Sequence, residues 1–277
     1  MSLIDLQQLP PPDVVESLDF EAVYQQHLAL FRQWVPDFDA VLESEPVVKI
    51  LEVSAYREIQ LRARINDAAR ANLLAFAGGA DLEQLAAFYG ISKMPDESDE
   101  RLRLRTQLRI AALAGNGTRE LYRLAALSVS QDIVDAAVLC PRPGAIVVAV
   151  WIAPGADAGL LLYTVRAALM SDETLMLGVD VSVCLARERR IDVAARLWRE
   201  PNAPTDLVFS LALEFPAWLE SYAQLGRDVP RSWLLSRLHV PGIARVELEA
   251  PATNIELADD EFAAPGEITL SDAGVSW

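Results

Sequence analysis

The chain has 277 residues, of which 52% are apolar and 23% charged, and this globular balance excludes an intrinsically disordered protein. Its 40 acidic and 24 basic side chains give a formal net charge of −16 at pH 7. Such a surface repels phosphate, so we expect no nucleic-acid partner; the acidic surface is either simply solvated or suited to a basic protein partner.

Cysteine content and hydropathy narrow the class further. Cys140 and Cys184 each lie in an apolar run, which indicates small buried side chains and no disulfide framework. The N-terminus lacks a basic stretch followed by an apolar one, so we expect no secretory signal. The apolar run 207–213 is ended by Glu214 and Pro216, well before the ~20 residues of a membrane span, so we expect no direct membrane span.

The first elements predicted along the chain are an extended leader and a helix. Three consecutive prolines fix the backbone dihedral φ and remove hydrogen-bond donors, which predicts an extended arm over residues 9–13. Apolar residues then recur at helical spacing over residues 20–34, and Pro36 stops this helix soon afterwards.

The strongest secondary-structure prediction is one long amphipathic helix over residues 46–76. Ser44 is a suitable N-cap, Pro46 fits the first turn, and glycines at 78–79 end the helix. About 30 residues at about 1.5 Å each would span about 45 Å. One apolar stripe follows the helix, and we expect it to bury against helices of partner proteins. The stripe consists of Leu51, Ala55, Ile59, Ile65, Ala69, Leu73 and Phe76.

Three shorter helices are expected next, each with its own start and stop signals. Asp81 is suited to cap the first, and Gly90 ends it. Ser98 begins the second, which continues toward Gly115, and Thr118 caps a third that reaches about residue 129.

From about residue 132 the hydrophobic pattern changes from helical to alternating, which predicts a domain boundary near residue 130. The expected order is ββαββ, with the helix laid over one face of a small, mainly antiparallel sheet. The elements are strands at 133–139 and 145–152, a helix at 157–170, and strands at 179–185 and 191–197 around a turn at 187–190.

The final third predicts helices near 205–224 and 230–239, a strand at 243–250 and a tail strand near 267–270. Pro216 leaves open whether the first helix is continuous or whether a second helix begins there, because an internal proline costs about 3 kcal/mol.

The predicted fold class is therefore α+β. A helical region at 1–130 holds the long helix, and one or two small α/β sandwich domains with mainly antiparallel sheets follow it. We place an α/β domain at 131–200 and a C-terminal α/β domain with the tail strand at 201–277.

Few residues could perform catalysis. His27 and His239 are the only histidines, and no HExxH, CxxC or EF-hand pattern is present, so we expect no metal and no cofactor. The residues at 115–118 form a helix-to-helix turn and no phosphate loop, because no lysine follows them. The carboxylates at 99–100 and 259–261 are expected at a helix start and in a loop; an enzyme that uses carboxylates stays open as an alternative.

The densest basic group of the chain lies near residues 101–109. It could contact an acidic protein neighbour, or it could form a solvated face with local ion pairs. Its members are Arg101, Arg103, Arg105 and Arg109.

Ordered sequence blocks extend across residues 14–271. The N-terminal blocks are YRE at 56–58, RARINDA at 62–68, ANLLAFAGGADL at 71–82 and ESDERLR at 97–103. The C-terminal blocks are LGRDVPRS at 225–232, VPGI at 240–243 and APGEITL at 264–270. In this order they resemble the baseplate assembly protein J family of contractile phage tails. The connection at 111–119 departs from the family pattern.

The resemblance implies a non-enzymatic wedge subunit of the baseplate in a contractile injection machine, either a phage tail or a tail-like bacteriocin. It implies an I-type baseplate wedge protein and a second copy of this chain as partners. The resulting wedges would form a ring around the central spike and hub, contact other wedge and hub or sheath-initiating proteins, and open on sheath contraction. Assembly would take place in the host bacterial cytoplasm. A free-standing cytoplasmic adaptor remains the alternative.

Overall fold

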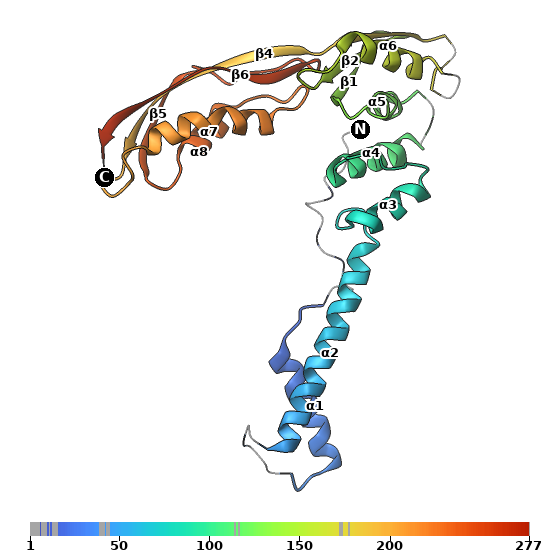
Figure 1. Ribbon diagram of the computed structural model, residues 1–277, viewed down its shortest axis with the longest axis vertical. Helices are drawn as coiled ribbons and strands as arrows, with labels where there is room; N and C mark the ends of the chain where they lie inside the picture. Colours follow the sequence, from blue (N-terminus) through green and yellow to red (C-terminus); the bar gives the residue numbers. More distant parts are fainter. Residues whose placement is uncertain are drawn as a thin grey trace. The chain divides into compact units, whose positions relative to one another are not determined.

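A computed structural model describes residues 6, 10, 12, 16–38, 42, 45–113, 115, 117–171, 174–176 and 178–276 (Figure 1). The chain forms two compact units, Met1–Gln107 and Leu108–Trp277. Within the described residues, no helix combines the length and the apolar character that crossing a bilayer needs.

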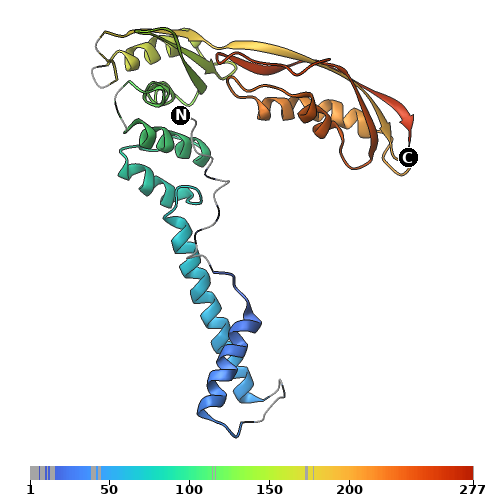
Figure 2. The ribbon, with the colours of Figure 1, turned by 180° about the vertical axis from the view of Figure 1, so that it is seen from behind.

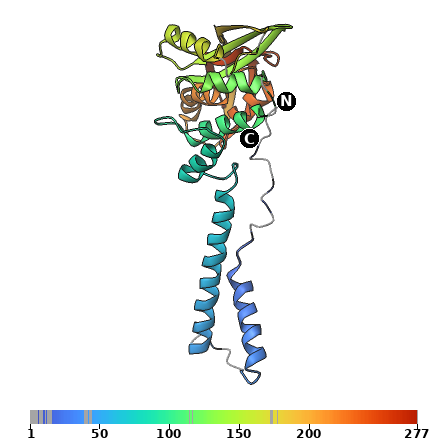
Figure 3. The same cartoon turned by 90° about the vertical axis from the view of Figure 1, so that its right-hand side faces the viewer.

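The first unit is built on a hairpin of two helices that lie side by side in opposite directions (Figure 3). Helix α1 (Phe20–Trp34) begins where the Asp19 side chain accepts hydrogen bonds from the amides of Glu21 and Ala22. Helix α2 (Pro46–Ala71) has Pro46 in its first turn. These helix starts were expected from the sequence, although the suggested cap Ser44 lies outside the described residues and Glu45 occupies the N-cap position.

The long helix is shorter than predicted, since α2 ends at Ala71 and not at Phe76. Arg103 explains the early end: its Nε donates to the Leu74 carbonyl at 2.8 Å and its Nη2 to the Ala77 carbonyl at 2.6 Å. The guanidinium thus satisfies carbonyl groups of a tight turn that follows the helix, and the helical hydrogen-bond ladder does not have to continue.

Helices α3 (Gly79–Phe88) and α4 (Asp99–Ala112) follow. Asp81 was expected to cap α3, but this is wrong: Gly78 is the N-cap, and the Asp99 carboxylate accepts the free Gly79 amide at 2.7 Å. The predicted stop is confirmed, because Gly90 has a φ of +76° and the Ile91 amide returns to the Ala86 carbonyl.

The second unit contains two three-stranded sheets. The first has the order β1-β2-β3, with β1 and β2 antiparallel and β2 and β3 parallel. Helices α5 and α6 contact each other and pack on β1 and β3, so both cover the same face. The elements are α5 (Arg119–Leu127), β1 (Ile133–Arg142), β2 (Ala145–Ile152), α6 (Ala158–Leu169) and β3 (Asp180–Leu185). Thr118 caps α5 as predicted, with its hydroxyl accepting from Leu121.

The second sheet has the order β5-β4-β6, and α7 and α8 pack on one face of it (Figure 2). Its central strand β4 runs antiparallel to β5 and parallel to β6. The elements are β4 (Arg187–Arg199), α7 (Leu207–Tyr222), α8 (Arg231–Leu238), β5 (Ile243–Ala250) and β6 (Glu261–Val275), the last much longer than the predicted tail strand.

The predicted hairpin around residues 187–190 is wrong. Strands β3 and β4 belong to different sheets, and Arg187 already pairs in register with Glu261 of β6. The Arg187 amide also donates to the Asp260 carbonyl at 2.8 Å, so the chain is engaged as a strand from this point. The two sheets meet where Trp151 of β2 stacks on Phe262 of β6, with ring centroids 4.3 Å apart.

Helix α7 is continuous through Pro216, which settles the alternative that the sequence left open. Phe215 and Leu219, on either side of the proline, are both completely buried against the sheet. Burying each is worth about 1.5–3 kcal/mol, and this offsets the about 3 kcal/mol that an internal proline costs.

The α+β class is confirmed, with each sheet mixed: one antiparallel and one parallel pairing. The change from helices to strands begins at Ile133, close to the expected position. The compact units divide between Gln107 and Leu108, so α5 packs with the strands. The division into segments 1–130, 131–200 and 201–277 stays a prediction.

Candidate partner-binding surface

The inner side of the α1–α2 hairpin holds a charged cluster centred on Glu58. One carboxylate oxygen lies 2.6 Å from His27 Nε2 of α1, and the other accepts from Arg62 Nε and Nη2 at 3.0 and 2.6 Å. The hydrogen bond from His27, followed by that from Arg62, lowers the pKa of Glu58. The pair of Glu58 with Arg62, expected from their spacing, is thus one part of a link between the two helices.

A second link attaches the segment before α1 to α2. Asn66 is buried, with 6% of its surface exposed, and its amide binds both backbone groups of Glu16. Arg62 Nη1 also contacts the Glu16 carboxylate at 3.0 Å. Sequence analysis missed Asn66 as a positioning residue; the available signal was a poor helix former in the middle of a long helix, away from either cap.

The seven residues of the predicted stripe do not share one environment. Ala55 is completely buried within the chain, and it lies between Leu51 and Glu58 on the side of α2 that faces α1. Ile65 is 59% exposed and Phe76 is 44% exposed. The half-buried members are Leu51, Ile59, Ala69 and Leu73, the last lying beyond the end of α2.

A different side of α2 carries the larger exposed apolar side chains. At about 100° per residue, Ile50, Leu61 and Ile65 fall within an arc of about 60°, rotated away from Leu51 and Ala55. They are 68%, 66% and 59% exposed. We call these three residues the outer α2 face. Periodicity alone did not separate this face from the one that α1 covers.

An apolar groove lies between the two helices at the end nearer their connection. It has a volume of about 440 Å³ and is lined by residues of both helices. Trp34 borders the groove and is 78% exposed, a high value for so large an apolar side chain. Groove residues that carry the apolar character are Leu30, Phe31, Trp34 and Val35 of α1 and its C-cap and Leu51 of α2.

The basic group near α4 has a structural role in two of its members. Arg105 Nη1 lies 3.0 and 2.9 Å from the two oxygens of Glu97, and both residues are buried. Arg103 holds the turn after α2, as described above. For these two side chains, the suggested contact with an acidic neighbouring protein is wrong, because their donors already bind groups inside the chain.

The carboxylates considered for catalysis are held by ordinary partners. Asp99 accepts from the Gly79 amide and from Lys93, and these bonds, the amide first, lower its pKa. Asp260 accepts two hydrogen bonds from Arg187, which lower its pKa. Among the described residues, no group of three or more His, Cys, Asp or Glu is placed to hold a metal ion.

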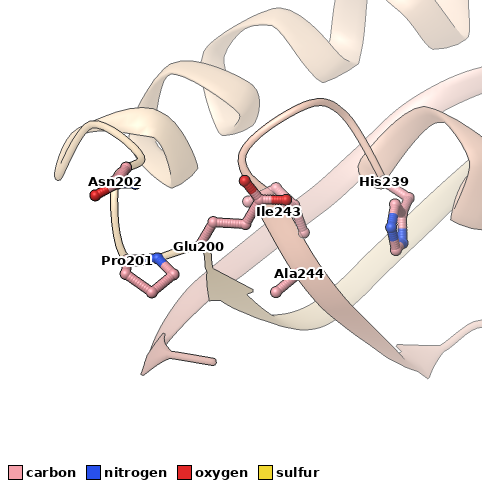
Figure 4. Close-up of a pocket in the computed structure, with 6 residues that line it drawn as sticks. All are labelled: Glu200, Pro201, Asn202, His239, Ile243 and Ala244. Atoms are coloured by element: carbon pink, nitrogen blue, oxygen red, sulfur yellow. The ribbon is translucent and has the colours of Figure 1, made fainter. Parts of the chain in front are cut away.

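His239 lines a shallow pocket of about 380 Å³ at the start of β5, together with Glu200 and residues beside them (Figure 4). The side chains of Glu200 and His239 lie on either side of the strand, and so they do not converge on a common point (Figure 4). This pocket therefore offers no acid–base pair.

Comparison with known proteins matches the chain to one family. The model of the Baseplate J-like N-terminal domain matches residues 43–94, which include α2 and α3. Baseplate protein J of Escherichia phage P2 is 34% identical over 282 residues, and the alignment covers 93% of each chain. A chain of the anti-feeding prophage baseplate, solved by cryo-EM, matches with a TM-score of 0.41 and 15% identity. That match covers 66% of this chain and 43% of the solved one.

Proposed function

The chain belongs to the baseplate protein J family, and on this premise we propose that it is a wedge subunit of a contractile injection machine. Membership of this family gives it a structural role in a baseplate, among other baseplate proteins. The proposal adds that an I-type wedge protein and a second copy of the chain are its direct partners. It further adds that the wedges form a ring around the spike and hub, and that this ring opens on sheath contraction.

The observation that carries the proposal is the outer α2 face of Ile50, Leu61 and Ile65. Large exposed apolar side chains at helical spacing mark interaction surfaces, since full burial of each is worth about 1.5–3 kcal/mol. Trp34 extends the apolar surface to the groove between α1 and α2. A partner helix that covers this face would complete a helical bundle.

The stripe first expected to bind partners has a divided part in this proposal. Ile65 and Phe76 keep a direct role because they are exposed. Leu51, Ala55 and Ile59, by contrast, hold the hairpin in shape or line its groove. We propose Ala69 and Leu73, both half-buried, as the border of the partner-binding surface.

Co-purification with the I-type protein tests the proposal. The double variant Ile50→Ser, Leu61→Ser should lose the partner while circular dichroism stays that of the native chain, because both side chains are exposed. Phe88→Ser is the matched control: Phe88 is 86% exposed on α3, outside the hairpin. Survival of the complex in the double variant, or equal loss in the control, would contradict the assignment.

A free-standing adaptor predicts a different result. Size-exclusion chromatography of the chain with each neighbouring tail protein should give a heteromeric complex if the wedge proposal holds. A chain that stays monomeric with every tail protein argues for the adaptor. Micrographs of extended and contracted particles that carry a label on this subunit test the ring and its opening.

A further inference from the structure

Helix α6 of the second unit has two apolar sides, and only one of them is covered. Leu161, Val165 and Leu169 are buried on the side that faces the sheet. The opposite side carries Leu160, Tyr163, Ala167 and, at the C-terminal cap, Met170, all of them exposed. Their spacing of three, four and three residues is that of a helix packed against another helix.

Helix α7, which packs on the other sheet, also exposes an apolar stripe (Figure 1). Phe209 is 68% exposed and Leu213 is 66% exposed, one turn apart, and Ala217 continues the stripe for another turn. The two stripes have similar lengths, about two to three helical turns each.

The charges on these helices are of opposite sign. The only charged residue of α6 is Arg166, which is exposed. Helix α7 has no basic residue and carries Glu214 and Glu220, both exposed. In the described part of the chain, none of the three side chains has an ion-pair partner. Arg166 and Glu214 each lie near the middle of their stripe, so they would face each other whether the helices run parallel or antiparallel.

From these observations we propose that α6 of one copy of the chain docks on α7 of a second copy. Pairing of like helices is disfavoured, because α6 on α6 would bring Arg166 near its own equivalent and α7 on α7 would gather glutamates. A contact between two different surfaces of the same chain is heterologous. It leaves one free α6 and one free α7, so it generates a ring or an open chain of copies and no closed pair.

The size of the stripes determines the strength of one contact. Two helix faces with three or four apolar side chains each bury less than the roughly 1,200 Å² of a stable protein interface. A single contact is therefore weak in dilute solution, and it gains strength where several copies are held together in a particle. The inference relies on the proposed function only for this last condition.

Sedimentation velocity of the full chain over a range of concentrations tests the proposal. The native chain should show reversible, concentration-dependent association at low salt. Arg166→Glu and Glu214→Arg should each weaken association by about threefold to tenfold, since an attractive exposed pair becomes repulsive. A mixture of the two variants should associate again, because each α6 then meets an α7 of opposite charge.

The outcomes separate the competing contacts. If α6 paired with α6, Glu214→Arg would leave association unchanged, and that result would overturn the proposal. Tyr163→Ser should weaken association whereas Phe88→Ser should not, which controls for loss of an exposed aromatic ring. A native chain that remains monomeric at every concentration would also overturn it.

The same variants distinguish this proposal from the wedge function. Arg166→Glu should still co-purify with the I-type protein, and the double variant Ile50→Ser, Leu61→Ser should still self-associate through α6 and α7. Loss of partner binding in the first case, or of self-association in the second, would show that the two surfaces are not independent.

Discussion

The side-chain amide of Asn66 binds the backbone of Glu16 through both of its polar atoms. Asn66 Oδ1 accepts from the Glu16 amide at 3.1 Å, and Asn66 Nδ2 donates to the Glu16 carbonyl at 2.8 Å. A residue with low helix propensity thus holds the segment before α1 against the middle of α2. The two helices and the preceding segment form one element, whose outer face is left for a partner.

Asn66→Ala should lower the free energy of unfolding of the first unit by about 0.5–2 kcal/mol. The loss of two partly buried hydrogen bonds is offset in part by the better helix propensity of alanine. Chemical denaturation measures the change, and limited proteolysis should cut faster near Glu16. Asn66→Asp keeps the acceptor and loses the donor, so its effect should be smaller. Unchanged stability and proteolysis in the alanine variant would contradict the assignment.

The Glu58 cluster predicts that the hairpin weakens in acid. Hydrogen bonds from His27 of α1 and Arg62 of α2 lower the pKa of Glu58 in the folded state. A depressed pKa means that the contribution is complete above the unfolded value of about 4.5 and is lost as pH falls through the folded value. The Glu16 carboxylate, which also contacts Arg62, is the other charged group at this site.

Thermal unfolding between pH 3 and 7 checks this dependence. The stability difference between the native chain and Glu58→Gln should be largest above about pH 5 and should shrink at lower pH. Glu52→Gln, which removes an exposed pair with Lys49, should change stability little and serves as the charge control. A difference that stays constant across the pH range would exclude the cluster as its origin.

Local chemistry made several element boundaries predictable. Pro46, Gly90 and Thr118 act on their own turn of the chain, through a fixed φ, a positive φ and a side-chain cap, and each lies where the sequence placed it. The end of α2 was not predictable in this way. Arg103 stops it from 29 residues away, a distance over which sequence patterns carry no signal.

Non-local pairing likewise limited the prediction of the sheets and the candidate surface. Alternating residues in β3 and β4 fit a hairpin as well as they fit two sheets; the choice depends on β6, whose Glu261 pairs with Arg187. On α2, apolar residues lie on two sides, and α1 decides which side is covered. Hence Ala55 became core while Leu61 stayed exposed.

The buried pair of Glu97 and Arg105 should be costly to break from one side. Arg105→Leu would leave the Glu97 carboxylate buried without its main partner, and we expect a loss of about 3–5 kcal/mol in unfolding free energy. Adding Glu97→Gln should recover part of this loss, because glutamine can still accept from the Met94 amide that Glu97 now binds at 2.8 Å. Urea denaturation of the single and double variants measures both terms.

Arg190→Leu is the control for removal of an arginine that pairs at the surface with Glu188. It should change the unfolding free energy by about 0–1 kcal/mol. A double variant less stable than Arg105→Leu would indicate that Glu97 is stabilised chiefly by other groups, of which Arg101 at 3.8 Å is the nearest.

Gly266 of β6 marks a place where two strands approach too closely for a side chain. A Cβ there would lie 2.2 Å from Asp192 Oδ1 and 3.0 Å from the backbone carbon and oxygen of Ile191. Asp192 also accepts the Glu267 amide at 2.8 Å, beside a shift in the register of β4 and β6. The side chain could rotate away only by giving up this bond, and the backbone could not move without opening the strand pair.

Gly266→Ala should therefore lower the unfolding free energy of the second unit by about 1–3 kcal/mol, as overpacking does. Gly115→Ala is the matched control, because a Cβ there meets no atom within 4 Å. It should be neutral or slightly stabilising, since alanine restricts the unfolded chain. Equal denaturation midpoints for the two variants would mean that the strands can separate at Gly266 without cost, against the close approach that the register shift creates.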